Sequence, residues 1–465
     1  MKKRLLAVLL TLVLAVGISG LASAKTAFSD GNRISRVELR EKTVEVSYRA
    51  EEAAELAAAL YTEDGKELFA SGRTKVSASA DGTAEIPISG EIPEYAVVKV
   101  FLLTRREHAP LCPAYTTSGY FRQPEDIGGT EAGAFDPERT LKLGDGGSFA
   151  VLKHGVVLVR TADDVSGKNR LVSRDDDAKC YQIQDAGTEL KTLYRGQLLA
   201  LETEPGQFLF VRVRKTETEG DTVTLHGDEG LKLGDLFDLM KIKAEAEKET
   251  RTVSLEQDGL NGEAVVGFSG KFEVCGTDEQ EFRMDCTLDI SGTATTTGAG
   301  ETDIELDAME WSPVEGVWFR VAPVLHLTTE DVGTVEWKLR QKLGFIYNSE
   351  TNQFEQLEPE AESFLAADRA EAVSLQITAE PTVTLWEDAV RLRMKSVWKG
   401  NSRMNEPDGT GTFSGTFAAE RRLEAGAVFL AEYGDPHSRE FLPEELPEKA
   451  FAWTPEKGRL SGGKE

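Results

Sequence analysis

The chain has 465 residues, of which 40% are hydrophobic, and its 80 acidic and 53 basic side chains give a formal net charge of -27. Such an acidic chain is a poor partner for a nucleic-acid backbone, because those contacts require Lys and Arg to neutralise phosphates. The hydrophobic content is too high for a disordered chain, and the length suggests about three packed domains.

Residues 1–24 have the organisation of a secretory signal peptide. Lys2, Lys3 and Arg4 precede an apolar run from Leu5 to Ile18, and small residues at 22–24 provide a cleavage site. We therefore expect an extracellular mature protein, either secreted or held at the cell surface. Nothing later in the chain reaches about 18 consecutive apolar residues, so we expect no membrane span.

Residues 25–116 are predicted to form a small β-sandwich. Thr43–Tyr48 alternates between apolar and polar positions, Tyr95–Leu103 is almost continuously apolar, and Asp64-Gly65 and Asp81-Gly82 supply turns. Short strands separated by glycine-containing turns are typical of sandwiches. Glu51–Leu60 is the exception, because its alanines and glutamates favour a short helix leading into a strand over 57–61.

Several segments of this region resemble a module found near the start of modular exported proteins of Gram-positive bacteria. These segments are Val44–Tyr48, Ala59–Tyr61 with Asp64–Lys66, Val98–Leu103 and Ala109–Cys112. The module is similar to immunoglobulin or fibronectin type III sandwiches, and the resemblance covers about a fifth of the chain. It implies a spacer or adhesion role and carries over no catalytic residues.

Residues 117–140 are predicted to be a linker, because they contain prolines, glycines and acids but few apolar residues. A second β-domain is expected over 141–247. It should contain a hairpin of Ser148–Leu152 and Val156–Arg160 and a short helix over Leu233–Met240. The polar stretch Lys243–Thr252 would then be a connector or a helix extension.

The third and largest domain is expected over 251–432, followed by a proline-rich, disordered tail over 433–465. Val335–Lys342 and Ala389–Lys399 both alternate between apolar and basic residues. This period of two indicates strands with one buried face, and we expect them to be neighbours in a large antiparallel sheet. The predicted fold class is all-β, with tandem antiparallel sandwich-like or barrel-like domains and few short helices.

The basic faces of these two strands are the first candidate site. If the strands share a sheet, six cations would form an anion-binding surface for an anionic glycan, a cell-wall polymer such as wall teichoic acid, or an acidic surface protein. The cations are Lys338, Arg340, Lys342, Arg391, Arg393 and Lys395. The alternative is that they face acidic residues on neighbouring strands, in ordinary surface ion pairs.

Two tryptophans are candidates for stacking on a sugar ring. Trp318 and Trp386 occupy the phase opposite to the apolar residues around them, so either could be exposed. The alternative is that they belong to the core, because tryptophan is highly buried on average.

Two of the four cysteines, Cys275 and Cys286, bracket an expected hairpin with its turn at 276–280. They could form a disulfide in an exported protein, or remain two buried thiols. No C-x-x-C motif is present, so neither a zinc site nor a redox site is indicated.

No motif for a cofactor, a metal or a catalytic nucleophile is recognisable in the sequence. We therefore expect an exported, non-catalytic binding or adhesion protein that needs no cofactor. The alternatives are a secreted carbohydrate-active enzyme, since paired carboxylates meet only in space, and a structural spacer.

Overall fold

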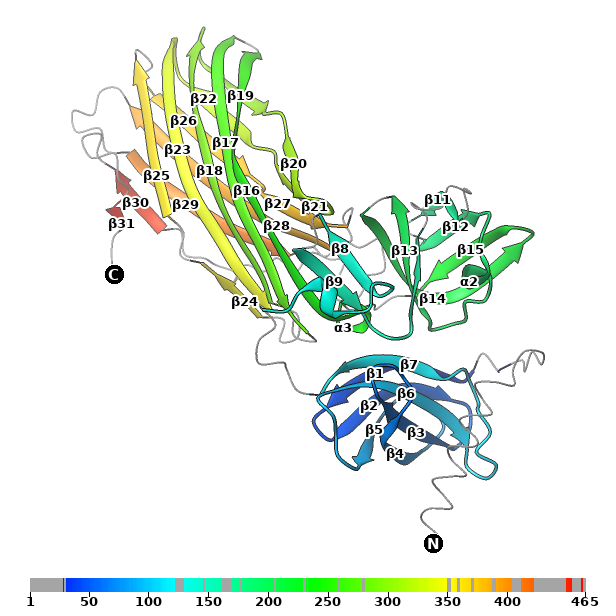
Figure 1. Cartoon of the computed structure of the whole chain (residues 1–465). Coiled ribbons are helices and arrows are strands. Elements are labelled where there is room, and N and C mark those ends of the chain that lie inside the picture. The colour runs from blue at the N-terminus through cyan, green and yellow to red at the C-terminus, as the bar shows by residue number, and fades with distance from the viewer. Residues whose placement is uncertain are drawn as a thin grey trace. The chain divides into compact units, whose positions relative to one another are not determined.

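The computed structural model describes residue 28 and residues 31–462, with gaps at 122–128, 145–146, 161–168, 176–177, 205, 229–230, 232, 258, 278–280, 349–352, 358–359, 369–371, 387–389, 404–410, 422–448 and 454–460. The expected signal peptide lies outside these residues. The chain is almost entirely β, as predicted, and its sheets are mainly antiparallel (Figure 1). None of the helices in the described part has the length and apolar character needed to cross a membrane.

The chain divides into two compact units. The first comprises Met1–Ala59, Ala70–Glu91 and Lys99–Tyr115, and the second comprises Leu60–Phe69, Ile92–Val98 and Thr116–Glu465. Both sides of the boundary expected near residue 250 therefore belong to the second unit.

A seven-stranded sheet forms the N-terminal region, with strand order β1-β2-β5-β4-β3-β6-β7. Its strands are β1 (Arg33–Arg40), β2 (Thr43–Ala50), β3 (Ala54–Tyr61), β4 (Leu68–Val76), β5 (Ser79–Ser89), β6 (Tyr95–Thr104) and β7 (Tyr115–Tyr120). The helix expected within Glu51–Leu60 is wrong, because β3 begins at Ala54 and every one of its residues is buried; the strand expected over 57–61 is part of β3. Small alanines fit this crowded strand, so packing overrides their helix propensity.

An eight-stranded sheet contains the longest strands of the second unit. Its path is β24-β23-β18-β17-β16-β9-β8, and β25 also pairs with β23. The strands are β8 (Thr140–Leu143), β9 (Ser148–Leu152), β16 (Phe237–Gln257), β17 (Leu260–Gly276), β18 (Glu281–Thr296), β23 (Gly333–Asn348), β24 (Gln353–Gln356) and β25 (Glu360–Asp368). The connector expected over Lys243–Thr252 is wrong, because these residues lie inside β16, which pairs with β17 on both sides of a single irregularity.

A ten-stranded sheet covers the other side of the same core. It follows the path β19-β22-β26-β28-β27-β21-β20 and is extended from β28 by β29, β30 and β31. The strands are β19 (Gly300–Glu305), β20 (Met309–Val314), β21 (Val317–Val321), β22 (Val324–Thr329), β26 (Ala372–Ala379), β27 (Thr382–Leu385), β28 (Val390–Arg403), β29 (Gly411–Arg421), β30 (Lys449–Trp453) and β31 (Ser461–Gly462).

These two sheets pack through one hydrophobic core that contains Trp337 from β23 and Trp398 from β28. Across the interface, the rings of Phe268 in β17 and Phe319 in β21 have centroids 6.4 Å apart. The inner faces of the two sheets therefore share a core, and their outer faces point in opposite directions.

The six-stranded sheet has the order β10-β13-β14-β15-β12-β11 and its own core. Its strands are β10 (Val156–Val159), β11 (Arg170–Asp175), β12 (Cys180–Gln184), β13 (Leu198–Glu204), β14 (Gln207–Glu219) and β15 (Thr222–Gly227). The short helices are η1 (Ala132–Ala134), α2 (Thr188–Lys191) and α3 (Leu233–Leu236), so the helix expected over Leu233–Met240 is confined to its first four residues.

The hairpin expected around residues 153–155 does not form. β9 pairs with β8 and β16, whereas β10 runs parallel to β13 in the six-stranded sheet. Residues 153–155 instead carry the chain from one sheet to the other. The glycine-containing turn was identified correctly, but a turn does not specify which strands pair.

Two segments expected to lack regular structure contain strands. β7 extends into the expected linker, and Thr117 and Ser118 of this strand are buried. Within the tail expected to be disordered, β30 and β31 continue the ten-stranded sheet. The remainder of 433–465 lies outside the described residues.

Candidate functional site

Three of the predicted cations lie on the outer face of the eight-stranded sheet. Lys338, Arg340 and Lys342 in β23 are exposed, whereas Leu339 and Gln341 between them are buried. The predicted alternation of this strand is therefore confirmed.

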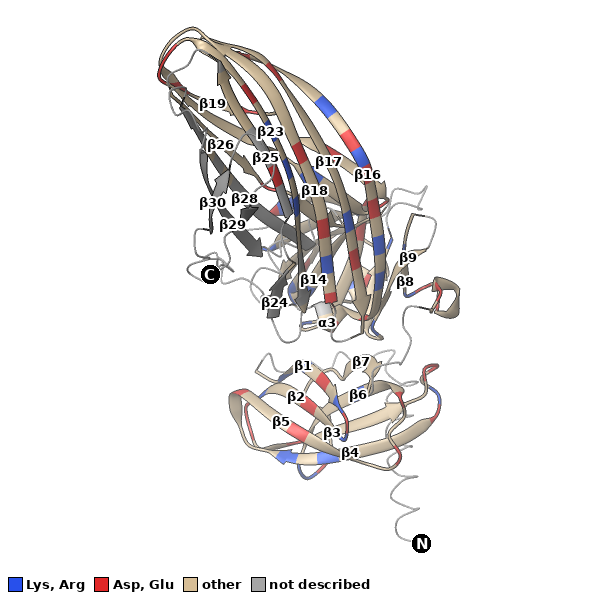
Figure 2. Ribbon diagram, turned by 90° about the vertical axis from the view of Figure 1, so that its left-hand side faces the viewer, with Lys and Arg blue, Asp and Glu red and all other residues tan. Residues whose placement is uncertain are grey.

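Acidic residues of both neighbouring strands, β18 and β25, lie in register with these cations of β23. Arg340 lies opposite Asp289 in β18 and opposite Glu362 in β25. The Nε atom of Arg340 is 3.7 Å from Asp289 Oδ1, and Lys248 Nζ is 2.5 Å from Asp289 Oδ2. Basic and acidic residues are likewise interspersed along β16, β17 and β18 (Figure 2). The positive charge of β23 is thus offset locally, in agreement with the alternative of cross-strand ion pairs.

The strands β23 and β28 are not neighbours, which corrects the prediction that they share a sheet. β23 belongs to the eight-stranded sheet and β28 to the ten-stranded sheet. The six predicted cations therefore do not form one patch. Alternation identifies the buried face of a strand, and it is equally compatible with pairing side by side or packing across a core.

The register of β28 instead places the positions of Arg391 and Arg393 on the face of the sheet that contains Trp318. Trp318 in β21 lies opposite Thr384 in β27, which lies opposite Arg391 in β28. In the next row, Arg320 lies opposite Thr382, which lies opposite Arg393. Residues directly opposite in antiparallel strands share a face of the sheet. We call this surface the Trp318 face and define it by the positions of Trp318, Arg320, Thr382, Thr384, Arg391 and Arg393; within it Thr382 is buried, whereas Thr384 is partly exposed.

The dimensions of the Trp318 face follow from sheet geometry. Neighbouring strands are about 4.8 Å apart, so the backbones of Trp318 and Arg391 are separated by about 10 Å. Successive outward residues on one strand, such as Trp318 and Arg320, are about 7 Å apart. Lys395 continues the alternation of β28 and lies opposite Ala418 in β29, beyond the end of β27.

Trp318 is held by a strand whose other face is completely buried. Its side chain is 38% exposed, whereas Val317 and Phe319 on either side are inaccessible to solvent. Phe319 also stacks on Trp311, with ring centroids 6.0 Å apart and an interplanar angle of 17°. These inward contacts fix β21, so the outward indole is presented on a rigid support.

A tight turn precedes Trp318 and sets the start of β21. Val314 pairs with Val317 across this turn, and Gly316 within it has φ +82°. The carbonyl oxygen of Gly316 accepts a 2.8 Å hydrogen bond from the backbone N–H of Trp386. A left-handed conformation of this kind is adopted readily only by glycine.

Cations outnumber acids among the paired positions of this face. Glu310 in β20 lies opposite Arg320, and Glu420 in β29 lies opposite Arg393, whereas Arg391 lies opposite a threonine. Within the part of the chain that the structure describes, Arg320 forms no ion pair. The face therefore combines an exposed indole with three arginine positions, two of which have an acid in register.

Trp386 is not exposed, which corrects its assignment as a sugar-stacking candidate. It is fully buried, stacks on Phe237 at a centroid distance of 5.2 Å and meets Phe210 edge-on at 5.5 Å. β27 ends at Leu385, and Trp386 has φ +49°. The alternation that placed this residue outward stops one residue earlier.

Cys275 and Cys286 are not bonded to each other. Cys275 lies opposite Glu281 and Cys286 lies opposite Gly270, so the cysteines are five register positions apart (275 − 270 = 5), or about 17 Å along the strands. Cys286 is also buried, whereas Cys275 is partly exposed on the other face. The predicted strands of this hairpin are confirmed, but its cysteines cannot be bridged without moving the backbone.

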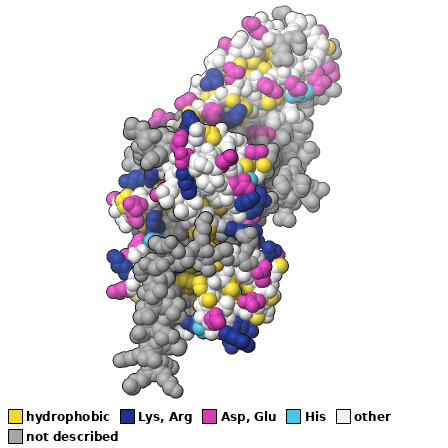
Figure 3. Space-filling model, turned by 90° about the vertical axis from the view of Figure 1, so that its right-hand side faces the viewer, with side chains coloured by type: hydrophobic (Ala, Val, Ile, Leu, Met, Phe, Trp, Pro, Cys, Tyr) yellow, Lys and Arg dark blue, Asp and Glu magenta, His cyan; other side chains and the backbone are white. Residues whose placement is uncertain are grey.

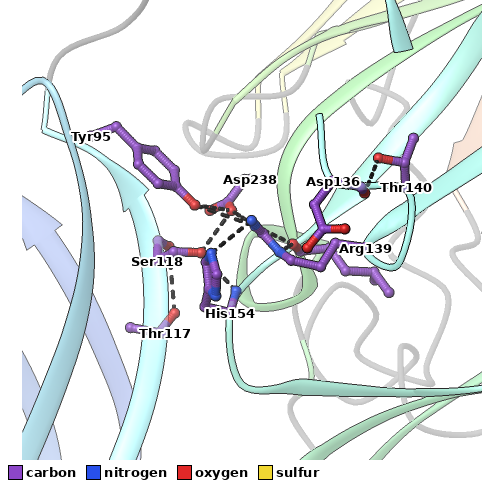
Figure 4. A network of polar contacts seen from close by, with 9 residues as sticks. Tyr95, Thr117, Ser118, Asp136, Arg139, Thr140, His154 and Asp238 are labelled. Carbon is purple, nitrogen blue, oxygen red and sulfur yellow. Dashed lines mark hydrogen bonds and ion pairs between the residues drawn. The ribbon is translucent and has the colours of Figure 1, made fainter. Parts of the chain in front are cut away.

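A buried polar network in the second unit escaped the sequence analysis (Figure 4). Asp238 Oδ2 accepts hydrogen bonds from Tyr95 at 2.8 Å, Ser118 at 2.7 Å and Arg139 at 2.5 Å. Arg139 Nη1 is also 2.8 Å from His154 Nε2. Ser118 and Arg139 fall within the expected linker, where no periodicity pointed to buried side chains.

Burial raises the pKa of Asp238, while Lys153 and Arg139 act in the opposite direction. Burial and the charge of Asp238 also raise the pKa of Tyr95. The Ser118 hydroxyl donates to Asp238 and accepts from the backbone N–H of His154 at 2.7 Å. Ser118 is completely buried, so this arrangement joins distant segments of the chain and does not present Ser118 to a substrate.

The sequence contained a signal for part of the Trp318 face. Trp318 and Arg320 share one phase of the strand Val317–Val321, but only Trp318 was singled out. Thr382 and Thr384, which connect them to Arg391 and Arg393, emerged only from the strand order.

Comparison of the chain with protein-family models and with curated proteins found no match.

Proposed function

We propose that the protein is an exported, non-catalytic binding protein and that its Trp318 face binds an anionic glycan or cell-wall polymer. The observation that carries this proposal is the register that aligns Trp318, Thr384 and Arg391 in one row and Arg320, Thr382 and Arg393 in the next. An anion-binding surface needs a local excess of cations, even when the net charge of the chain is negative.

Arginine is well suited to this role. Its planar guanidinium group can donate two parallel hydrogen bonds to a carboxylate, sulfate or phosphate group, and these charge-assisted bonds are stronger than neutral ones. The positions belong to paired strands, so the backbone that carries them needs little ordering when a ligand binds. On the face drawn in Figure 3, charges of both signs are interspersed over the described residues.

The three cations of β23, Lys338, Arg340 and Lys342, are weaker candidates for anion binding than the Trp318 face. Arg340 has acidic residues in register on both sides, and one of them already contacts Lys248. A polymer would have to compete with these intramolecular partners. The Trp318 face is therefore the preferred surface.

The test is binding of the mature protein to immobilised anionic cell-wall polymers and sulfated glycans over a series of salt concentrations. Replacing Arg320, Arg391 and Arg393 with Glu should weaken binding at least about tenfold, since hydrogen bonds to charged groups contribute about 1.5–3 kcal/mol each. The affinity of the wild-type protein should fall as salt increases.

The matched control replaces three exposed lysines of the N-terminal region, Lys42, Lys66 and Lys75, with Glu. It changes the net charge by the same amount and should leave most of the binding intact. Equal loss in both variants would mean that net charge alone governs attraction. Loss only when Lys338, Arg340 and Lys342 are replaced would move the site to β23, and no binding by the wild-type protein would favour a spacer.

A further inference from the structure

Building on the proposed function, we infer that the Trp318 face recognises a pyranose ring that carries an anionic substituent. The ligand would be a polymer of uronic acids or sulfated sugars, in which rings and charges alternate at short intervals. A chain of charges without rings would not satisfy the same surface.

The inference begins with the surroundings of the indole. Trp318 is 38% exposed, and its outward neighbours are Arg320 on the same strand and Thr384 on the next. These neighbours are polar, so Trp318 does not form part of an apolar patch of the kind that contacts another protein. An aromatic ring surrounded by hydroxyl and guanidinium groups matches a ligand that is apolar on one face and polar at its edges, as a pyranose ring is.

The second step is the spacing between the ring and the charges. Arg320 lies one outward position along the strand from Trp318, about 7 Å away, and Arg391 lies two strands away, about 10 Å. A sugar stacked on Trp318 would thus have one cation close to its own substituents. The second distance is comparable to the length of a disaccharide, so the position of Arg391 on the face corresponds to the next sugar of the polymer.

The third step concerns the type of anion. Carboxylate and sulfate groups each present two oxygen atoms that can accept the two parallel N–H hydrogen bonds donated by a guanidinium group. Uronates and sulfate esters therefore share the chemistry that this face would recognise. Thr384, between Trp318 and Arg391, adds a hydroxyl that can donate to or accept from a ring hydroxyl.

Four soluble polymers distinguish recognition of a charged sugar ring from recognition of a ring alone or of charge alone. Polygalacturonate supplies rings with carboxylates, dextran sulfate supplies rings with sulfates, dextran supplies rings without charge, and polyphosphate supplies charge without rings. Binding of each to the mature protein should be measured by calorimetry at fixed ionic strength. We expect binding to polygalacturonate, dextran sulfate or both, and at least about tenfold weaker binding to dextran and polyphosphate.

The decisive variant is Trp318→Ala. It should reduce affinity for the ring-containing anionic polymers about three- to tenfold, the range expected for one aromatic contact, and Trp318→Phe should retain most of the affinity. Phe69→Ala removes another exposed aromatic side chain, 49% exposed, and should have no effect. Thermal unfolding should show that Trp318→Ala remains folded with a modestly lower Tm, because its side chain is partly buried but lies outside the core cluster.

The outcomes distinguish this inference from the function on which it depends. If polyphosphate binds as tightly as the charged glycans and Trp318→Ala changes nothing, ring recognition is wrong while anion binding stands. If none of the polymers binds, both proposals fail. Binding to only one of the two charged glycans supports the inference and identifies the anionic group.

Discussion

The side chains of Arg139 and Asp238 form an ion pair of 2.5 Å, in which only 13% and 3% of the two side chains are exposed. Tyr95 and Ser118 donate to the same carboxylate oxygen, while the other oxygen of Asp238 is buried and has no hydrogen-bond partner among the described residues. One buried atom therefore connects residues from four separate segments of the chain.

Replacing Asp238 with Asn should destabilise the protein strongly. The substitution leaves Arg139 buried without its counter-ion, and breaking a buried pair in this way costs about 3–5 kcal/mol. The measurement is the free energy of unfolding of the second unit from urea denaturation. The control is Asp221→Asn, which removes a solvent-exposed pair with Lys191 and should cost less than about 1 kcal/mol. Equal effects of the two substitutions would show that the network contributes little.

Asp64 should remain ionised in unusually acidic solution. Hydrogen bonds from the Thr62 hydroxyl and the Lys66 backbone lower its pKa from 3.8 to about 2. Because the folded pKa lies below the unfolded one, the stability contributed by Asp64 is complete above about pH 4 and is lost as the pH falls toward 2. A carboxyl NMR titration measures this pKa directly. Thr62→Val should raise it toward 3.8, and by more than Lys66→Ala, because the hydroxyl is the larger cause.

The cysteines should behave as thiols of different accessibility. Burial raises the pKa of Cys112 to about 12 and also raises the pKa of Cys286. Both should resist iodoacetamide in the native protein at pH 8, whereas the partly exposed Cys180 should react. Peptide mass spectrometry after alkylation measures each site. Recovery of a disulfide-linked peptide containing Cys275 and Cys286 would contradict the register of β17 and β18.

Two glycine substitutions should separate backbone strain from crowding. Gly316 and Gly220 both have positive φ, but a Cβ at Gly316 would lie 2.5 Å from Leu143 Cδ2, whereas one at Gly220 would meet nothing within 4 Å. Gly220→Ala should cost about 1 kcal/mol from strain alone. Gly316→Ala should cost about 1–3 kcal/mol more, because it also overpacks a buried site. Urea denaturation tests both, and equal costs would mean that Leu143 moves aside freely.

Alternation of side chains predicted the faces of individual strands well. It assigned Trp337 to the core and Lys338 to the surface, and the structure confirms both. It also assigned the apolar side of β28, where Trp398 is buried. The period of two reflects the geometry of a single strand, so it is visible within a few residues of sequence.

Strand partners could not be predicted in the same way. β23 and β28 carry matching patterns, yet they belong to sheets on opposite sides of one core. Arg391 and Trp318 are far apart in the chain, and their positions share one face of the sheet because both strands pair with β27. Pairing between distant segments depends on the whole chain, and no local pattern encodes it.

Composition is a poor guide to structure where tertiary packing dominates. The alanines of β3 suggested a helix, and the charged residues of β16 suggested a connector. Lys243, Glu245 and Glu247 are exposed, but Ala244 and Ala246 between them are buried, so the segment alternates with alanine as its apolar partner. Alanine is a weak marker of a buried strand face, which explains why both strands were missed.

The uninterrupted course of β16 has a practical consequence for recombinant work. Its 21 residues span the domain boundary that the composition suggests near residue 250, where a truncated fragment would otherwise be designed to end. A fragment that ends near residue 247 would expose half of a hydrogen-bonded ladder and invite pairing with other molecules. A recombinant polypeptide should therefore contain all of β16 together with its partner strands and the segments that supply Tyr95, Ser118 and Arg139 to buried Asp238, because neither half would be expected to remain soluble by itself.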